Sequence, residues 1–217
     1  MPQMTDETVS QSFSLAHANT KDGRRNSFSP PHSGSPALLA ISLVGFMGAG
    51  KTTVGRALAT RLGWRFEDLD DVIQAREGRS IEQIFQQGES AFRDLERMAV
   101  REVLMTANSA PLVLALGGGA FVEEQVQETL RDAKIPAVFL DAEVEELFRR
   151  SEQPDVVRPL RQDRNRFCQL YARRRPAYLK AQLRIETGGK AIAAVVEEII
   201  AGLGLIPKSV PKSGVCE

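Results

Sequence analysis

From Pro36 onward, short apolar runs alternate with longer segments whose apolar residues recur at helical spacing. The runs predict β-strands at 37–44, 64–67, 112–116, 137–140 and 183–186. The intervening segments predict helices at 51–62, 71–76, 81–87, 90–106, 123–131, 143–150, 163–180 and 191–203, with a capping box formed by Ser80 and Gln83. Strands followed by crossover helices predict an α/β fold, a parallel sheet with helices on both faces. Ligands of such sheets bind beyond the carboxyl ends of the strands.

The N-terminal part of the chain lacks this pattern. Residues 1–35 are rich in Ser, contain the pair Pro30-Pro31 and show no apolar period. Such a segment cannot bury enough surface to offset chain entropy, so we expect a disordered tail. Both histidines, His17 and His32, lie in this tail, which argues against histidine catalysis. The tail has no apolar run typical of a secretory signal.

We therefore expect one folded domain at 36–205, followed by a second flexible tail at 206–217. The 28 Lys and Arg residues balance the 28 Asp and Glu residues, which argues against bulk attraction to nucleic acid or to an anionic membrane surface. No apolar run approaches the roughly 18 residues of a membrane span. Two cysteines cannot form a disulfide framework, and this fits a reducing compartment such as the cytoplasm.

The charges are unevenly distributed. Residues 123–148 carry 8 acidic and 2 basic side chains, whereas residues 149–184 carry 11 basic and 3 acidic ones. A run of charge is usually a solvated helix face, and we expect this for Arg164, Arg166 and some of the arginines at 173–175. The remaining cations could instead bind a highly charged nucleotide.

The strongest motif is the segment from Gly45 to Thr52, which matches G-x-x-x-x-G-K-[ST] and lies between a predicted strand and a predicted helix. In such a loop, backbone N–H groups face a phosphate, Lys51 neutralises the outer phosphates and the Thr52 hydroxyl can hold Mg²⁺. The alternative is a Gly-rich turn that only caps a helix. The two flanking elements favour the phosphate loop.

An acidic pair follows the second predicted strand. Asp68 and Asp70 are two residues apart, so on an extended strand end they would point to the same side. One carboxylate could serve the metal and the other could bind and deprotonate a substrate hydroxyl. The alternative is a solvated acidic cluster that caps a helix.

Two further motifs lie on the third helix–strand unit. Arg93 and Glu96 are spaced i, i+3 on a predicted helix, which fits either an exposed pair or a guanidinium fixed for anion binding. The glycines of the run 117–119 follow a predicted strand, where they allow close approach of the backbone to a ligand.

In chain order these motifs resemble the shikimate kinase family over about residues 38–204. The matching segments are the phosphate loop, Asp68-x-Asp70, Phe92-Arg93-x-x-Glu96, Gly117-Gly118-Gly119-Ala120, Arg158-Pro159-Leu160 and Arg174-x-Pro176-x-Tyr178. The resemblance implies a nucleoside-monophosphate-kinase-like fold with strand order 2-3-1-4-5, substrate-binding helices at about 70–106 and a lid at about 150–163. It also implies ATP-dependent phosphorylation of the shikimate 3-hydroxyl, a step of chorismate and aromatic amino-acid synthesis.

The resemblance also implies a role for each matched residue. ATP would be bound by Gly48, Ala49, Gly50, Lys51, Thr52, Thr53, Arg150 and Arg158, and Mg²⁺ by Thr52 and Asp68. Shikimate would be bound by Asp70, Arg93, Gly118, Gly119 and Arg174, the last holding its carboxylate. The catalytic residues would be Lys51, Asp70 as base and Arg158 on the transferring phosphate. Arg150 and the loop 187–190 would flank the adenine.

Arg161 departs from the family pattern, because a second Leu usually follows the R-P-L segment. Arg175 receives no role from the motif. Two other functions remain open: a kinase of another small metabolite such as gluconate, and a nucleotide-binding regulator without catalysis. We expect shikimate and ATP as partners, neither nucleic acid nor a membrane, and a monomer in the cytoplasm.

Overall fold

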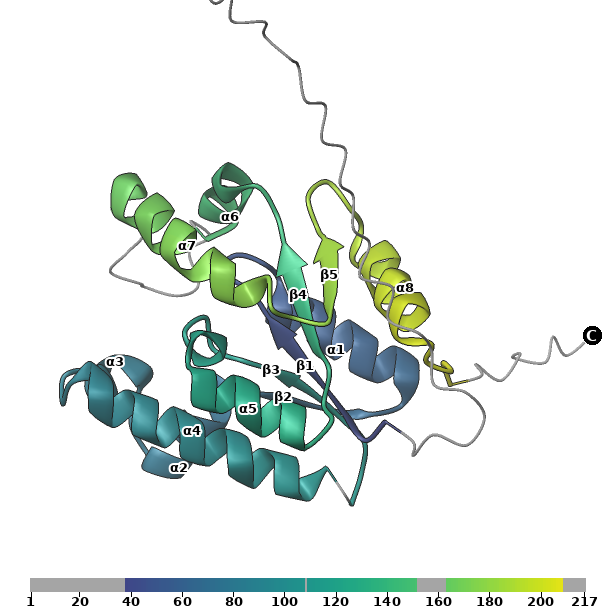
Figure 1. The fold of residues 1–217 in the computed structure, drawn as a ribbon, viewed down its shortest axis with the longest axis horizontal. Helices are drawn as coiled ribbons and strands as arrows, with labels where there is room; N and C mark the ends of the chain where they lie inside the picture. The colour runs from purple at the N-terminus through teal and green to yellow at the C-terminus, as the bar shows by residue number, and fades with distance from the viewer. Residues whose placement is uncertain (1–37, 108, 152–162, 209–217) are drawn as a thin grey trace, which may run out of the picture.

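The computed structural model describes residues 38–107, 109–151 and 163–208. They form a five-stranded, all-parallel sheet in the order β2-β3-β1-β4-β5, which confirms the expected fold and strand order (Figure 1). The strands are β1 (Ala40–Val44), β2 (Arg65–Asp68), β3 (Leu112–Ala115), β4 (Ala137–Asp141) and β5 (Leu183–Glu186).

The helices lie where helical periodicity predicted them, with bounds that differ by up to two residues. They are α1 (Lys51–Leu62), α2 (Leu69–Glu77), α3 (Ile81–Phe85), α4 (Glu89–Thr106), α5 (Glu124–Asp132), α6 (Val144–Ser151), α7 (Arg164–Tyr178) and α8 (Ile192–Leu203). A short 3₁₀ helix, η1 (Ala120–Val122), was not predicted. The capping box of Ser80 and Gln83 is confirmed at the start of α3.

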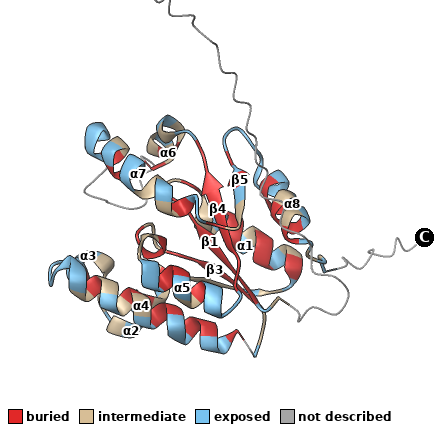
Figure 2. Ribbon diagram, in the orientation of Figure 1, coloured by how far each residue is buried: buried red, intermediate tan, exposed pale blue. Residues whose placement is uncertain are grey.

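The helices form two layers around the sheet. Helices α1 and α8 cover one face, and α4 and α5 cover the other (Figure 1). Every residue of β1, β3 and β4 is buried, whereas β2 and β5, at the two edges, are only partly buried (Figure 2). Central strands covered on both faces must be apolar throughout, which explains why these strands are visible as continuous apolar runs.

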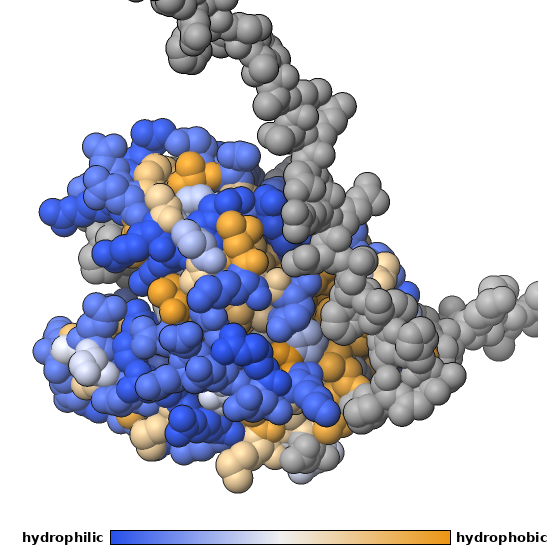
Figure 3. All heavy atoms as spheres, in the orientation of Figure 1, coloured by the Kyte–Doolittle hydropathy of each residue, from blue (hydrophilic) through white to orange (hydrophobic). Residues whose placement is uncertain are grey.

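Polar side chains cover much of the outer helical layer. On the face drawn in Figure 3, hydrophilic residues predominate over the region of α4 and α5. In the described ranges, no helix is both long enough and apolar enough to cross a membrane.

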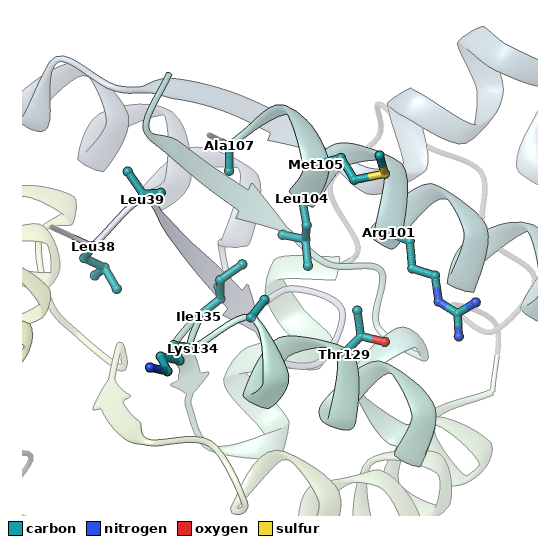
Figure 4. A pocket seen from close by; sticks show the side chains of 10 residues that line it. Leu38, Leu39, Arg101, Leu104, Met105, Ala107, Thr129, Lys134 and Ile135 are labelled. Carbon is teal, nitrogen blue, oxygen red and sulfur yellow. The ribbon is translucent and has the colours of Figure 1, made fainter. Parts of the chain in front are cut away.

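A cavity of about 540 Å³ opens at the amino ends of the strands (Figure 4). Leu38 and Leu39 before β1, Leu104 and Met105 at the end of α4, and Ile135 before β4 line it. The glycine-rich loops and the acidic pair lie at the opposite, carboxyl edge. This cavity is therefore separate from the candidate site.

Candidate active site

The phosphate loop connects β1 to α1 and depends on glycine at defined positions. Gly48 and Gly50 have φ values of 81° and 88°, which disfavour residues with side chains. A Cβ atom at Gly48 would lie 2.3 Å from the carbonyl oxygen of Leu147. The Lys51 Nζ atom donates hydrogen bonds to the carbonyls of Gly45 at 3.0 Å and Phe46 at 3.1 Å. Two backbone carbonyls of the loop thus hold the lysine ammonium. Thr52 and Thr53 follow in the first turn of α1.

The acidic pair lies beside this loop, but not in the way that strand periodicity predicted. Asp68 ends β2 and is the N-cap of α2, where its Oδ1 accepts a hydrogen bond from the Asp70 backbone N–H at 3.2 Å. Asp70 is therefore helical, and the expectation of two aspartates on one strand face is wrong. The physical reason is that the Asp68 side chain starts a helix one residue before Asp70. Asp68 Oδ2 accepts a hydrogen bond from Thr52 Oγ1 at 2.7 Å.

The glycine run after β3 brings the predicted substrate residues together. A Cβ atom at Gly117 would lie 2.7 Å from Asp70 Oδ1 and 3.0 Å from Glu96 Oε1. At Gly119 it would lie 2.3 Å from Arg93 Nη1, and at Gly118 the nearest atom would be Arg174 Nη1 at 3.6 Å. Three side chains from α2, α4 and α7 therefore converge on one short loop, in which Gly117 and Gly118 are partly exposed and Gly119 is buried.

Arg93 and Glu96 form a buried ion pair, so the reading as an exposed pair is wrong. Their side chains are 11% and 1% exposed, and Arg93 Nη1 lies 2.7 Å from Glu96 Oε2. Burial raises the pKa of Glu96 to about 7, against the charge of Arg93, and the nearby Asp70 charge adds to the rise. Burial alone would lower the pKa of Arg93, but Glu96 and Glu89 outweigh it and raise this pKa.

Glu96 has one oxygen without a hydrogen-bond partner. Its Oε1 is buried and unpaired among the described residues, and it faces the position of Gly117. An unpaired buried oxygen is costly, so it marks a place where the fold gives up stability.

Arg174 reaches the same loop from α7. Its Nη1 donates to the Gly118 carbonyl at 3.2 Å, and the Tyr178 hydroxyl donates to the same carbonyl. Its guanidinium also lies 5.9 Å from the centre of the Phe46 ring in the phosphate loop. Burial lowers the pKa of Arg174, and the Arg93 cation acts in the same direction. Burial raises the pKa of Tyr178 to about 12.

The residues predicted to flank the adenine also meet. Arg150, near the end of α6, donates to Thr187 Oγ1 at 3.1 Å and to the Thr187 carbonyl at 3.0 Å. Arg158 and Arg161, with most of the predicted lid, lie outside the described residues.

The basic segment contains two kinds of arginine. Arg164 and Arg166 are exposed and pair with Glu145 and Asp163, as expected of a solvated helix face. Arg175 instead lies 3.0 Å from the buried carboxylate of Asp141, a residue that sequence reasoning missed. An acidic residue at the end of an otherwise apolar strand was the available signal.

No group of three or more His, Cys, Asp or Glu side chains is arranged to hold a metal ion within 38–107, 109–151 and 163–208. Oxygen donors near phosphates nevertheless suit Mg²⁺, which usually takes one or two protein ligands beside phosphate and water. Thr52 and Asp68 provide such a donor set.

Comparison with known proteins agrees with this geometry. A family model described as shikimate kinase matches residues 47–203. A shikimate kinase of Persephonella marina is 38% identical over 161 residues, which cover 74% of this chain and 96% of the relative. One of Caulobacter vibrioides is 42% identical over 167 residues, which cover 75% and 81% of the two chains. The solved shikimate kinase of Acinetobacter baumannii in complex with shikimate is 37% identical, with a TM-score of 0.69, and the match covers 76% of this chain and 92% of that one.

Proposed function

This chain belongs to the shikimate kinase family, and from that membership we propose how its own residues perform the reaction. The enzyme uses ATP to phosphorylate the 3-hydroxyl of shikimate, giving shikimate 3-phosphate and ADP, in chorismate and aromatic amino-acid biosynthesis. Phosphoryl transfer requires little covalent chemistry from the protein. Its residues mainly align the two substrates and stabilise charge.

ATP phosphates bind at the phosphate loop. The backbone N–H groups of Gly48, Ala49 and Gly50, with the first turn of α1 at Thr52 and Thr53, supply donors and the positive end of a helix dipole. Lys51 moves from the loop carbonyls to the outer phosphates and neutralises their charge. Support for this assignment comes from the positive φ values of Gly48 and Gly50 and from the position of the lysine.

Thr52 and Asp68 would hold Mg²⁺ beside the ATP phosphates. The 2.7 Å contact between the hydroxyl and the carboxylate puts two hard oxygen donors at the start of α1, which is the chemistry that Mg²⁺ prefers. When bound, the ion neutralises charge on the phosphate oxygens. Asp68 also keeps its capping bond to the Asp70 backbone, so it fixes the start of α2.

Shikimate binds over the Gly117–Gly119 loop. Arg174 takes its carboxylate, Arg93 binds beside it, and the Gly118 and Gly119 backbone approaches the ring closely. Asp70 binds the 3-hydroxyl and accepts its proton as the oxygen attacks the phosphorus atom. The single observation that carries this proposal is the convergence of Asp70, Arg93 and Arg174 on this one glycine loop.

Arg158 stabilises the transferring phosphate in this proposal, and Arg150 contacts the nucleotide from the adenine side. The role of Arg158 rests on its sequence motif alone. The contact of Arg150 with Thr187 supports a nucleotide-side role, because it links the two segments predicted to flank the adenine. We keep the folded domain at 36–205, with the lid at about 150–163, a monomeric state and a cytoplasmic location as parts of the proposal.

A coupled assay of ADP release tests the acceptor. Shikimate, gluconate and nucleoside monophosphates are compared at saturating ATP. Turnover of shikimate alone is expected, whereas turnover of gluconate without shikimate would contradict the assignment, as would tight ATP binding without transfer to any acceptor.

Asp70→Asn tests the catalytic base. We expect kcat to fall by roughly 10²- to 10⁴-fold, because the amide cannot accept the proton, while the Kd of ATP stays nearly constant. Asp71→Asn is the matched control, since Asp71 is the exposed next residue of the same helix turn and should retain activity. A loss of ATP affinity comparable to the loss of turnover would contradict the assignment.

A further inference from the structure

Asp141 is a buried carboxylate to which the reaction scheme gives no role. It ends β4 and is 2% exposed. Its Oδ1 accepts hydrogen bonds from the Ala142 backbone N–H at 3.1 Å and the Tyr171 hydroxyl at 2.8 Å. Its Oδ2 accepts from Arg175 at 3.0 Å and Arg184 at 2.9 Å. Both oxygens are thus fully used, and the donors come from α7 and β5 as well as from its own strand end.

The backbone of Asp141 makes a second set of contacts. Its carbonyl accepts from the Thr187 N–H at 2.7 Å and from Thr187 Oγ1 at 3.0 Å. Thr187 in turn accepts both hydrogen bonds of Arg150 described above. One residue therefore connects α7 with the loop after β5 and, through it, with the end of α6.

Helix α7 is also the helix that carries Arg174. Arg175 is its neighbour, and Tyr171 lies one turn earlier on the helix. The Tyr171 ring packs edge-on against Phe46 of the phosphate loop, with 5.5 Å between ring centres. Tyr171 and Arg175, the two side chains of α7 that donate to Asp141, thus lie on either side of Arg174 in the helix sequence.

We infer that Asp141 is a positioning residue that fixes α7, and with it the Arg174 guanidinium, and that ties this helix to the Arg150–Thr187 contact on the nucleotide side. This inference rests on the proposed roles of Arg174 and Arg150. The family motif leaves Arg175 without a role. In this inference Arg175 holds helix α7 in place and does not bind the substrate.

The contacts suit this function better than a general role in stability. Arg175 and Arg184 are 34% and 50% exposed, so losing Asp141 would release them toward solvent rather than trap two buried cations. The helix would then keep its packing through Phe167 and Tyr178, both fully buried, while its contact with the strand end is lost. Burial, with the bond to Asp141, raises the pKa of Tyr171 to about 12, so this hydroxyl remains a donor throughout the working pH range.

Asp141→Asn tests the inference. The amide keeps an acceptor oxygen for one side but loses the charge that holds the two arginines, so α7 should shift relative to the glycine loop. We expect the KM of shikimate to rise roughly tenfold and the KM of ATP roughly threefold, with kcat changed less than about twofold. Tyr171→Phe removes one donor to Asp141 and the acceptor of Arg175 Nε but keeps the charge of Asp141, so it should give a smaller rise of the same kind. It also keeps the test valid if Asp141→Asn does not fold.

Two controls separate positioning from lost stability. Glu197→Gln makes the same chemical change in the Arg61–Glu197 ion pair between α1 and α8, and it should leave both KM values unchanged. Ile199→Ala opens the buried face of α8 and should lower the unfolding midpoint without a selective rise in KM. A rise in KM for Ile199→Ala equal to that for Asp141→Asn would overturn the inference.

Arg174→Ala, measured beside these variants, distinguishes the positioning role of Asp141 from the substrate-binding role of Arg174. If it raises the KM of shikimate and both Asp141→Asn and Tyr171→Phe do not, the positioning role is wrong and the site assignment stands. If it leaves this KM unchanged, the role of Arg174 is wrong, and the inference about Asp141 falls with it.

Discussion

Helices α4 and α7 each place an arginine against the Gly117–Gly119 loop, but the two arginines are held by different chemistry. Arg93 on α4 is paired with two carboxylates, Glu96 at 2.7 Å and Glu89 at 3.0 Å. Arg174 on α7 donates to the carbonyl of Gly118, and no carboxylate of the described segments forms an ion pair with it. The pKa of Arg93 is raised and that of Arg174 is lowered.

This difference indicates which of the two arginines binds a substrate carboxylate more favourably. At Arg93 an incoming carboxylate must share a cation that is already paired with Glu96 and Glu89. At Arg174 it meets a partly buried cation whose charge is uncompensated, and the Coulomb attraction is strong because little water separates the groups. We therefore expect Arg174 to provide most of the affinity for the carboxylate, and Arg93 mainly to orient the substrate.

Arg174→Ala should have the largest effect on affinity. We expect the KM of shikimate to rise roughly 50-fold, since a charge-assisted contact in a partly buried site is lost, and Arg93→Ala should raise it less. Steady-state kinetics at saturating ATP measures both. Arg173→Ala is the control, because Arg173 is the exposed preceding residue of the same helix. Equal effects at positions 93 and 174 would remove the distinction between the two arginines.

Gly119→Ala tests whether the fixed position of Arg93 matters in itself. The added Cβ would lie 2.3 Å from Nη1 and 2.6 Å from Cζ, so the guanidinium must leave its place beside Glu96. We expect the KM of shikimate to rise roughly tenfold, with the charge of Arg93 intact. Gly118→Ala should raise it less, because there the nearest atom would be 3.6 Å away. A larger effect at Gly118 would contradict the importance of the Arg93 position.

Much of this arrangement was accessible from the sequence because the periodicity of a buried parallel sheet is strong. The continuous apolar runs of β1, β3 and β4 predicted strands within a few residues, and the phosphate loop followed from its motif and flanks. The order of the strands came from the family resemblance, since no local pattern specifies which strands are neighbours.

The errors have a common physical origin in side-chain contacts. Asp70 was expected on a strand, but capping by Asp68 makes it helical. Glu96 could not be distinguished from an exposed helix residue, because its burial depends on the loop that α4 packs against. Asp141 has no motif of its own, and its partners come from segments 30 and 43 residues away along the chain.

The smallest expected effect concerns the carboxylate that compensates Arg93. With a folded pKa of about 7 against 4.5 for the free side chain, Glu96 keeps a proton in the native state after the unfolded chain has lost it. The native state then binds more protons, so stability must fall as the pH rises toward and through 7. Urea unfolding should show a loss of about 1 kcal/mol between about pH 6 and pH 7 relative to Glu96→Gln, in which this proton cannot titrate.

Glu89→Gln is the matched control for this measurement. Glu89 contacts the same guanidinium but is 68% exposed, so its substitution should leave the pH dependence in place. Loss of the slope in Glu89→Gln, or its persistence in Glu96→Gln, would show that another group carries the titration. The expected result would instead mean that the charge compensation of Arg93 by Glu96 weakens as the pH falls, so that Glu89 alone remains as its carboxylate partner.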